Sequence, residues 1–423
     1  MPNQISIKLS PVLRLLLLAT ALLFLVAFVF VFRWCIADSA ATRANNKEIA
    51  EFTTAWAPDD PQTHYTLALI NEKSFLSADL TKAVQSYEKA ASLSPFDFRY
   101  WLPLAQARER SGDSEGGEKA MRRALELAPN YAQIHWAIGN MLLRQGRNEP
   151  AFAEMKQALE ANPMFAATAA ATALQFSDEE PAVLLQKLGN SSGVKAAMAV
   201  ALVRQKNFDA GMAVWNSVPE NERRESFADR ENDIFGVLME NKKFRYAQQL
   251  RSRSGQNSAG FVNPGFEHEL DLTGASPFDW KIAEGAQPRI GFDAQQKYEG
   301  SRSLGIVFQK GSGKEFRAIS QTVIVEKNTS YRFKAVFHSE LTTTSELKWE
   351  IADAGSGEIL ATTKDISGKS DGWQLLSADF KTSAQTEAVI IRFVRTGCQN
   401  CSVEGKLWFD DFSLISGAAK MEG

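Results

Sequence analysis

The chain has 423 residues and a formal net charge of -3, with 47 Lys and Arg against 50 Asp and Glu. At roughly 100 to 200 residues per domain, this length predicts about three domain-sized pieces. Hydrophobic residues make up 44% of the chain, which is enough for packed cores. No bulk positive charge exists to attract a phosphate backbone, so nucleic acid is not an expected partner. Three cysteines cannot frame a disulfide-rich domain or a four-thiolate zinc site.

The first predicted element is a membrane-spanning helix at residues 15–32. These residues read LLLLATALLFLVAFVFVF and are long enough to cross a bilayer at about 1.5 Å per residue. Arg33 and Trp34 follow directly, whereas a cleaved signal peptide has an apolar run of only about 7 to 15 residues before a small-residue site. Small residues at 39–41 keep cleavage open as the alternative. We expect residues 1–36 to be a cytoplasmic tail and an uncleaved anchor.

Basic groups set the expected orientation of this anchor. Lys8 and Arg14 precede the helix within a very short tail, and the positive-inside rule puts that tail in the cytoplasm. The sequence therefore predicts a single-pass protein of a bacterial inner membrane, with most of the chain in the periplasm or an equivalent compartment. In such a compartment Cys398 and Cys401 can form and keep a structural disulfide, with two free thiols as the alternative.

Residues 45–253 are predicted to form a helical array. Ala, Leu, Glu, Lys and Arg are frequent, with apolar residues at spacings of three and four. Pro95, Pro129 and Pro163 lie 34 residues apart, each at the end of a predicted helix. A fixed period of this length is typical of stacked helix-turn-helix repeats, whose neighbours bury one another's apolar faces.

Two of these repeats resemble the tetratricopeptide repeat family. The resemblance in residues 98–131 is carried by Trp101, Leu104, Ala105, Gly112, Gly117, Met121, Ala124 and Pro129. In residues 132–165 it is carried by Ile138, Gly139, Leu142, Gly146, Ala151, Met155, Ala158 and Pro163. Arg108 departs from the pattern, because the family usually has an aromatic or aliphatic residue there. An earlier repeat spans about residues 61 to 97, and degenerate repeats are expected to continue the solenoid to 253.

The resemblance implies a protein-interaction array that carries no catalytic chemistry. In this family the first helices line a concave groove, which holds a peptide or a partner domain. The positions that match the groove are Arg99, Gln106 and Arg110 in one repeat, and Trp136, Asn140 and Arg144 in the next. Arg and Trp are residue types that anchor protein interfaces. The alternative is that Trp136 packs between repeats and the arginines form a solvated face.

A β domain is predicted after residues 254–260, a linker of small and polar residues. Side chains alternate with period two in three segments that contain Tyr331, Phe333, Ala335 and Phe337, then Leu347, Trp349 and Ile351, then Val389, Ile391 and Phe393. Short strands separated by Gly, Ser, Asn and Asp predict an antiparallel sandwich over residues 261–416, with a tail at 417–423. The expected fold class is therefore multidomain, with an anchor, an α-helical solenoid and a β-sandwich in chain order.

The β domain contains three landmarks, namely Asn-Pro-Gly-Phe-Glu at 263–267, Gly-Ser-Arg-Ser-Leu at 300–304 and Phe-Asp-Asp-Phe-Ser-Leu at 409–414. In this order they resemble the galactose-binding-like jelly roll, in particular the carbohydrate-binding modules of bacterial polysaccharide enzymes. The resemblance implies a structural calcium where the two ends of the domain meet, held by Glu267, Ser301 and Asp410. Calcium takes six to eight oxygen ligands, which carboxylates and carbonyls supply. The alternative is that these acids are surface caps or turn residues.

The same resemblance implies sugar binding through an exposed aromatic ring. Trp280 and Trp373 occupy positions that are core in the family, and Trp349 alternates in phase with apolar neighbours. Trp408 is out of phase with Leu407 and is therefore the candidate sugar contact, against the alternative that it only packs.

These patterns favour a non-catalytic envelope scaffold, since the four histidines lack metal-ligand spacing and no nucleophile elbow is present. Such a scaffold would grip a partner protein in its groove and engage polysaccharide with its β domain, in the assembly or export of a cell-surface polymer. A second hypothesis is a purely protein-binding subunit of a membrane complex, with a structural sandwich and no sugar. A third is the accessory part of a polysaccharide-degrading enzyme, which would normally need a catalytic domain in the same chain.

Overall fold

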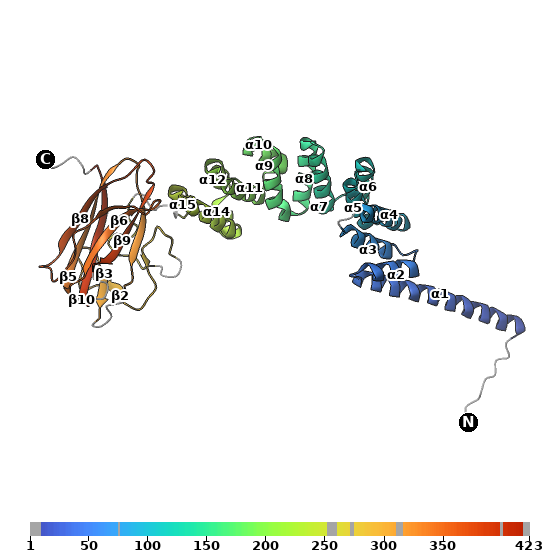
Figure 1. The fold of residues 1–423 in the computed structure, drawn as a ribbon, viewed down its shortest axis with the longest axis horizontal. Helices are drawn as coiled ribbons and strands as arrows, with labels where there is room; N and C mark the ends of the chain where they lie inside the picture. The colour runs from blue at the N-terminus through green and yellow to red at the C-terminus, as the bar shows by residue number, and fades with distance from the viewer. Residues whose placement is uncertain are drawn as a thin grey trace, which may run out of the picture. The chain divides into compact units, whose positions relative to one another are not determined.

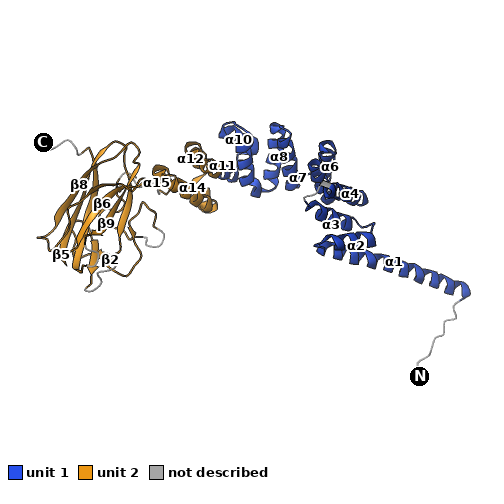
Figure 2. Ribbon diagram, viewed as in Figure 1, with its two compact units in different colours: residues 1–198 blue, residues 199–423 orange. Residues whose placement is uncertain are grey.

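The computed structural model describes residues 10–74, 77–251, 260–270, 275–309, 316–397 and 401–417. The chain divides into two compact units, residues 1–198 and 199–423 (Figure 2). This division falls inside the helical region, within α11 (Ser192–Arg204), and not at the predicted linker 254–260. All of that linker except Gly260 lies outside the described residues.

Unit 1 begins with α1 (Pro11–Arg43), which is one continuous helix (Figure 1). Ser10 accepts a hydrogen bond from the backbone N–H of Leu13, and Pro11 stands at a position that needs no N–H donor. Among the described residues, α1 is the one helix long and apolar enough to cross a membrane, and none of its apolar stretch is buried. Its last turns are different, because Ala37 and Ala41 are buried where α1 packs against α2 (Lys47–Trp56) and α3 (Pro61–Glu72).

The rest of the helical region is a succession of short helices, as the sequence predicts. In unit 1 they are α4 (Ser77–Leu93), α5 (Phe98–Arg110), α6 (Ser114–Leu127), α7 (Ala132–Arg144), α8 (Asn148–Ala161), the 3-10 turn η1 (Pro163–Phe165), α9 (Ala166–Phe176) and α10 (Pro181–Leu188). In unit 2 they are α12 (Phe208–Asn216), α13 (Glu220–Ser226), α14 (Ala228–Glu240) and α15 (Phe244–Arg251). The helices of unit 1 pair as hairpins, with α3 on α4, α5 on α6 and α7 on α8.

Small residues allow the paired helices to approach closely. A Cβ atom added to Gly117 would stand 3.1 Å from the Ala105 carbonyl oxygen, and one added to Gly139 would stand 2.9 Å from Met155 Cγ. Each contact joins the two helices of one hairpin. These glycines therefore set the spacing of the hairpins, which is why they appear at the offsets that the repeat pattern requires.

A ring nitrogen joins successive hairpins. On the first helix of three successive repeats, a ring nitrogen lies within hydrogen-bonding distance of the carbonyl of the proline six residues earlier. The pairs are His64 and Pro58 at 2.8 Å, Trp101 and Pro95 at 3.0 Å, and His135 and Pro129 at 2.7 Å. The prolines therefore end one repeat and also accept a hydrogen bond from the next.

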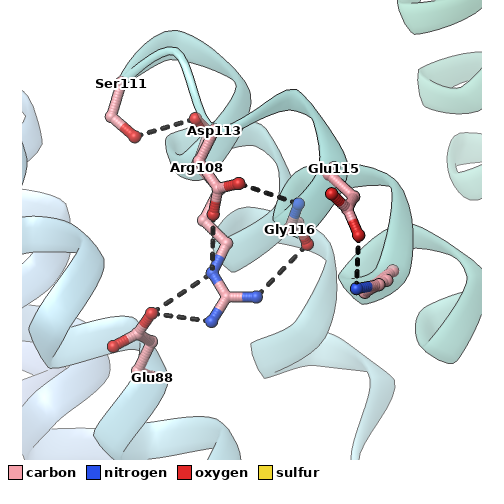
Figure 3. Close-up of polar contacts among 7 residues, drawn as sticks. Glu88, Arg108, Ser111, Asp113, Glu115 and Gly116 are labelled. Carbon is pink, nitrogen blue, oxygen red and sulfur yellow. Dashed lines mark hydrogen bonds and ion pairs between the residues drawn. The ribbon is translucent and has the colours of Figure 1, made fainter.

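Arg108, which departs from the family pattern, replaces an apolar contact with polar ones (Figure 3). Its guanidinium lies 2.7 Å from a Glu88 carboxylate oxygen on α4 and donates to the Gly116 carbonyl of α6 at 3.2 Å. It also lies 3.9 Å from Asp113, the residue that caps α6. One arginine on α5 thus connects the helices on both sides of it.

Unit 2 ends in two five-stranded antiparallel sheets, which confirms the predicted sandwich. The strands are β1 (Lys281–Ile282), β2 (Arg289–Asp293), β3 (Ser303–Phe308), β4 (Ile319–Ile324), β5 (Ser330–Thr343), β6 (Glu346–Asp353), β7 (Ile359–Thr362), β8 (Gln374–Lys381), β9 (Ala388–Thr396) and β10 (Val403–Ser416). Their order is β1-β4-β9-β6-β7 in one sheet and β2-β3-β10-β5-β8 in the other. The alternating residues of β5, β6 and β9 supply the core, together with Trp280 and Phe412.

Candidate functional site

The first helices of three successive repeats line one groove in unit 1. It has a volume of about 1150 Å³ and is formed by α3, α5, α7 and residues that follow them. All six residues that the sequence matches to a groove lie along it, namely Arg99, Gln106, Arg110, Trp136, Asn140 and Arg144. The repeat period therefore brings together side chains from two repeats on one concave surface.

Besides the predicted Trp136, the groove contains aromatic rings that sequence reasoning missed, among them Phe98, Tyr131 and Phe165. Trp136 stacks on Phe165, with ring centroids 5.0 Å apart, and Phe98 lies 4.9 Å from Tyr131. Trp136 is only partly buried, so it packs between repeats and also presents an edge to the groove. Phe98 and Tyr131 occur at nearly the same repeat position, which is the signal that would have indicated them.

The groove arginines are paired with acids of the same chain. Arg144 donates to both carboxylate oxygens of Glu109, at 2.9 and 2.7 Å. Arg110 donates to one carboxylate oxygen of Glu72, which belongs to the preceding repeat. Arg99 lies 2.6 Å from the Asp97 carboxylate. Burial lowers the pKa of the Arg110 guanidinium from its ordinary value.

These ion pairs form a ladder that follows the repeat period. Arg144 pairs with Glu109, which directly precedes Arg110, the equivalent position in the preceding repeat. Arg110 pairs in turn with Glu72, near the end of the first helix of the repeat before it. Carboxylates therefore offset the charge of the groove arginines, and the pairs of Arg110 and Arg144 each join two successive repeats. Two amides also lie along the groove. Gln106 is exposed, and Asn140 donates to the Trp136 carbonyl at 3.0 Å.

The three residues expected to hold calcium lie together at one end of the sandwich. Both oxygens of the Glu267 carboxylate accept hydrogen bonds from the backbone N–H of Ser301, at 3.0 and 3.1 Å. Asp410, which is 1% exposed, accepts from the backbone N–H groups of Tyr298 and Glu299 at 3.0 and 3.2 Å. Ser301 thus donates to the neighbouring acid, although the sequence predicted it as an oxygen ligand.

The two carboxylates differ in their electrostatics. Hydrogen bonds from the Ser301 hydroxyl and amide hold the pKa of Glu267 below its ordinary value. Burial raises the pKa of Asp410, and the charge of Glu267 adds to that rise. Gly265 lies against both acids, because a Cβ there would stand 3.4 Å from Asp410 Oδ1 and 3.9 Å from Glu267 Cγ. No group of three or more His, Cys, Asp or Glu side chains is placed to hold a metal within the described ranges.

Trp408, the predicted sugar contact, is not exposed. It lies in β10 with only 3% of its surface accessible, and its Nε1 donates to Asp293 on β2 at 2.9 Å. His338 on β5 stacks against it, with centroids 5.3 Å apart. Alternation correctly placed Trp408 outside the central core, but side chains of neighbouring strands cover it on the outer side of the sheet.

Another tryptophan is more accessible than the family pattern suggested. Trp280 and Trp349 are core residues, as predicted, at 1% and 0% exposure. Trp373 instead precedes β8, is only partly buried, and has its ring 6.0 Å from Tyr298 and 6.0 Å from His338. Tyr298 is 48% exposed. The result is a row of rings in the order Tyr298, Trp373, His338 and Trp408.

Of the two cysteines in the predicted disulfide, the structure describes Cys401. Cys401 is disulfide-bonded, and its predicted partner Cys398 lies outside the described residues. Cys35, at the end of the apolar stretch, is a free and exposed thiol.

Comparison with protein families agrees with the helical part of this description. The model of the tetratricopeptide repeat matches residues 98–131 and 132–163. These residues therefore form tetratricopeptide repeats, which are a type of protein-interaction array. No curated protein matches the chain.

Several solved structures are similar to parts of the chain. One is MamA (AMB-1), with 28% identity, a TM-score of 0.24 and coverage of 27% of this chain and 61% of that one. Another is the CBM22-1 xylan-binding domain of Paenibacillus barcinonensis Xyn10C, with 15% identity, a TM-score of 0.25 and coverage of 39% and 97%. The CBM22-1-GH10 modules of Clostridium thermocellum xylanase 10B show 16% identity and a TM-score of 0.26. The similarity covers 38% of this chain and 30% of the xylanase chain.

Proposed function

We propose that this protein is a non-catalytic scaffold of the bacterial cell envelope, which holds a partner protein in its helical groove. One observation carries the proposal: side chains from successive repeats converge on a single groove of about 1150 Å³. In this proposal α1 anchors the chain in the inner membrane, with its amino terminus in the cytoplasm and the remaining chain in the periplasm.

The chemistry of the groove indicates the kind of segment it takes. Its arginines already have carboxylate partners, so an acidic ligand would have to compete with Glu72 and Glu109 for them. The rings of Trp136 and Phe98 and the exposed amide of Gln106 remain for contact. Apolar burial against rings is the usual source of affinity in such a site, and amides satisfy a peptide backbone. We therefore expect an extended segment with apolar side chains and few charges.

Photocrosslinking tests the groove directly. With benzoylphenylalanine at Gln106 in the full-length protein, irradiation of native membranes is expected to give one discrete adduct with another protein. The control position is Arg122, whose side chain is 67% exposed on α6 and does not line the groove. Equal adducts at both positions, or none at Gln106, would contradict the proposal.

A second proposed activity is polysaccharide binding by the sandwich, supported by the row of rings from Tyr298 to Trp408. Partly exposed Trp373 and exposed Tyr298 offer faces on which a sugar ring can stack. We expect the full-length protein to bind a defined polymer on a glycan array, and Trp373→Ala to weaken that binding at least about tenfold, or ~1.4 kcal/mol. The control is Ile359→Ala, an exposed apolar side chain on the other sheet. A folded protein that binds no glycan would favour the purely protein-binding scaffold.

A structural calcium at Glu267 and Asp410 is a further part of the proposal. The pKa of Asp410 is raised in the folded protein, so the free energy of unfolding falls as pH rises through the titration of this carboxyl group. A cation bound to the ionised carboxylate would offset this loss. At pH 7 we expect calcium to raise the unfolding temperature of the sandwich by about 4 °C or more relative to chelator. Asp410→Asn should abolish the difference. Identical melting curves for the wild type in calcium and in chelator would exclude the site.

A further inference from the structure

The end of α1 and α2 form a hairpin in which α2 returns toward the apolar stretch of α1. α1 leaves that stretch at Phe32 and continues to Arg43, and α2 begins at Lys47 and packs against it (Figure 1). The connection between the two helices is only three residues long, so α2 runs antiparallel to the end of α1. The carboxyl end of α2 must therefore approach the level at which α1 would leave a bilayer.

Contacts between α1 and the carboxyl end of α2 fix that level. The Arg33 side chain donates through Nε to the backbone carbonyl of Trp56, the last residue of α2. A small cavity is lined by Phe30, Arg33 and Trp34 on one side and by residues 57–59 on the other. Phe30 belongs to the apolar stretch itself. The turn after α2 thus lies beside the last residues of the membrane-spanning segment.

Exposed aromatic side chains gather at this level. Trp34 is 48% exposed, Phe52 is 64% exposed, and the Phe52 ring lies 5.8 Å from that of Trp56. Residues 52 and 56 are one helical turn apart, so they share a face of α2. Ala50 and Thr53 are buried on the face that packs into unit 1, whereas the Phe52 side chain has no such cover among the described residues.

We propose that Trp34, Phe52 and Trp56 form an aromatic collar that inserts into the lipid headgroup layer, so that the carboxyl end of α2 is held at the membrane surface. Rings with one apolar face and one polar edge favour this layer, which is about 5 to 8 Å thick on each side of the hydrocarbon core. One turn of α2 rises about 5.4 Å, so Phe52 and Trp56 both fit within it. The inference rests on the proposed function in one respect, because it requires α1 to span the bilayer.

The charges around the collar indicate how it would bind. Arg33 and Lys47 are accompanied by Glu48, Glu51 and Asp59, so this end of unit 1 has no excess of positive charge. Binding should therefore depend on ring burial and not on anionic lipids, and salt should change it little. The collar would also fix the helical array at the bilayer, because α1 is continuous from the apolar stretch into the buried contacts of Ala37 and Ala41.

A fluorescent label reports the depth of each position. The full-length protein with Cys35→Ser is reconstituted in phosphatidylcholine vesicles, and single cysteines are introduced and labelled with NBD under non-reducing conditions. The positions are Phe52→Cys and Pro58→Cys near the collar, Leu22→Cys in the apolar stretch, and Glu115→Cys, whose side chain is 82% exposed at the start of α6. Lipids that carry a nitroxide at the headgroup or deep in the acyl chain serve as quenchers.

We expect headgroup nitroxide to quench the labels at 52 and 58 at least about threefold more than the label at 115, in 50 mM and in 500 mM salt alike. The deep nitroxide should quench most strongly at 22. If the label at 22 lies in the acyl chains while the labels at 52 and 58 are quenched no more than the label at 115, the proposed collar is contradicted and the membrane anchor is supported. If the label at 22 is itself exposed to water, the anchor fails, and the collar fails with it.

Discussion

Replacing Trp349 by Ala is expected to destabilise the sandwich by about 3 to 5 kcal/mol, the range for removing a large aromatic from a packed core. Trp349 lies on β6 with 0% exposure, and its ring centroid is 5.0 Å from Phe412, 5.2 Å from Phe409 and 5.3 Å from Phe393. These rings come from three different strands of both sheets. Truncation would therefore leave a cavity between the sheets that neighbouring rings cannot fill without losing their own contacts.

Trp349→Phe is the matched control for this prediction. Within the described part of the chain, the buried Nε1 of Trp349 has no hydrogen-bond partner, and such an unpaired donor costs about 1 to 3 kcal/mol. Phe keeps most of the ring contacts and removes that donor, so its effect should be much smaller than that of Ala. Urea unfolding followed by tryptophan fluorescence measures both variants. An Ala variant within about 1 kcal/mol of the wild type would show that the core is not built around this ring.

Gly405→Ala should disrupt the pairing of β10 with β5. Gly405 has a φ of +114°, which L side chains rarely adopt, and it pairs with Leu341. A Cβ atom there would stand 2.2 Å from the Glu340 carbonyl oxygen, which belongs to the backbone and cannot rotate away. The backbone conformation alone costs about 1 to 3 kcal/mol, and relieving the overlap requires the two strands to separate. We expect a total loss larger than this range.

Gly291→Ala is the control for that substitution. Gly291 lies on β2 of the same sheet, and no described atom lies within 4 Å of a Cβ added there. It should leave the free energy of unfolding within about 1 kcal/mol of the wild type, since replacing glycine by alanine where the conformation allows it lowers only the entropy of the unfolded chain. Hydrogen exchange of the β10 amides tests both variants. Exchange that is faster than in the wild type for Gly291→Ala, or exchange that is no faster than in the wild type for Gly405→Ala, would contradict this account.

Periodicity predicted the architecture because it reports which residues face the core. The spacing of Pro95, Pro129 and Pro163 indicated the hairpins, and the six groove positions were implied by the resemblance to the tetratricopeptide repeat family. Period-two alternation identified Trp349 and Phe393 as core residues. In both cases the pattern reflects burial that each repeat or strand must achieve, which is why a single sequence suffices.

Contacts between distant elements were beyond the reach of such patterns. The outer position of Trp408 is visible in its phase, but its cover comes from Asp293 and His338, which lie 115 and 70 positions earlier and meet it only through the strand order. The Arg144 to Glu109 pair is hidden in the same way, because its partner belongs to another repeat. Sequence composition likewise showed where α1 is apolar, and not that its end packs into the helical array.

The central claim is that the groove in unit 1 holds a protein segment, and one affinity measurement tests it most directly. A synthetic peptide covering the segment crosslinked at Gln106 is titrated against the full-length protein, against Trp136→Ala and against Arg122→Ala. The account predicts that Trp136→Ala weakens the affinity at least about tenfold, or ~1.4 kcal/mol, because the ring that stacks on Phe165 is lost from the groove. Arg122→Ala should bind like the wild type. Equal affinity for all three proteins, each with an unchanged melting temperature, would contradict the account.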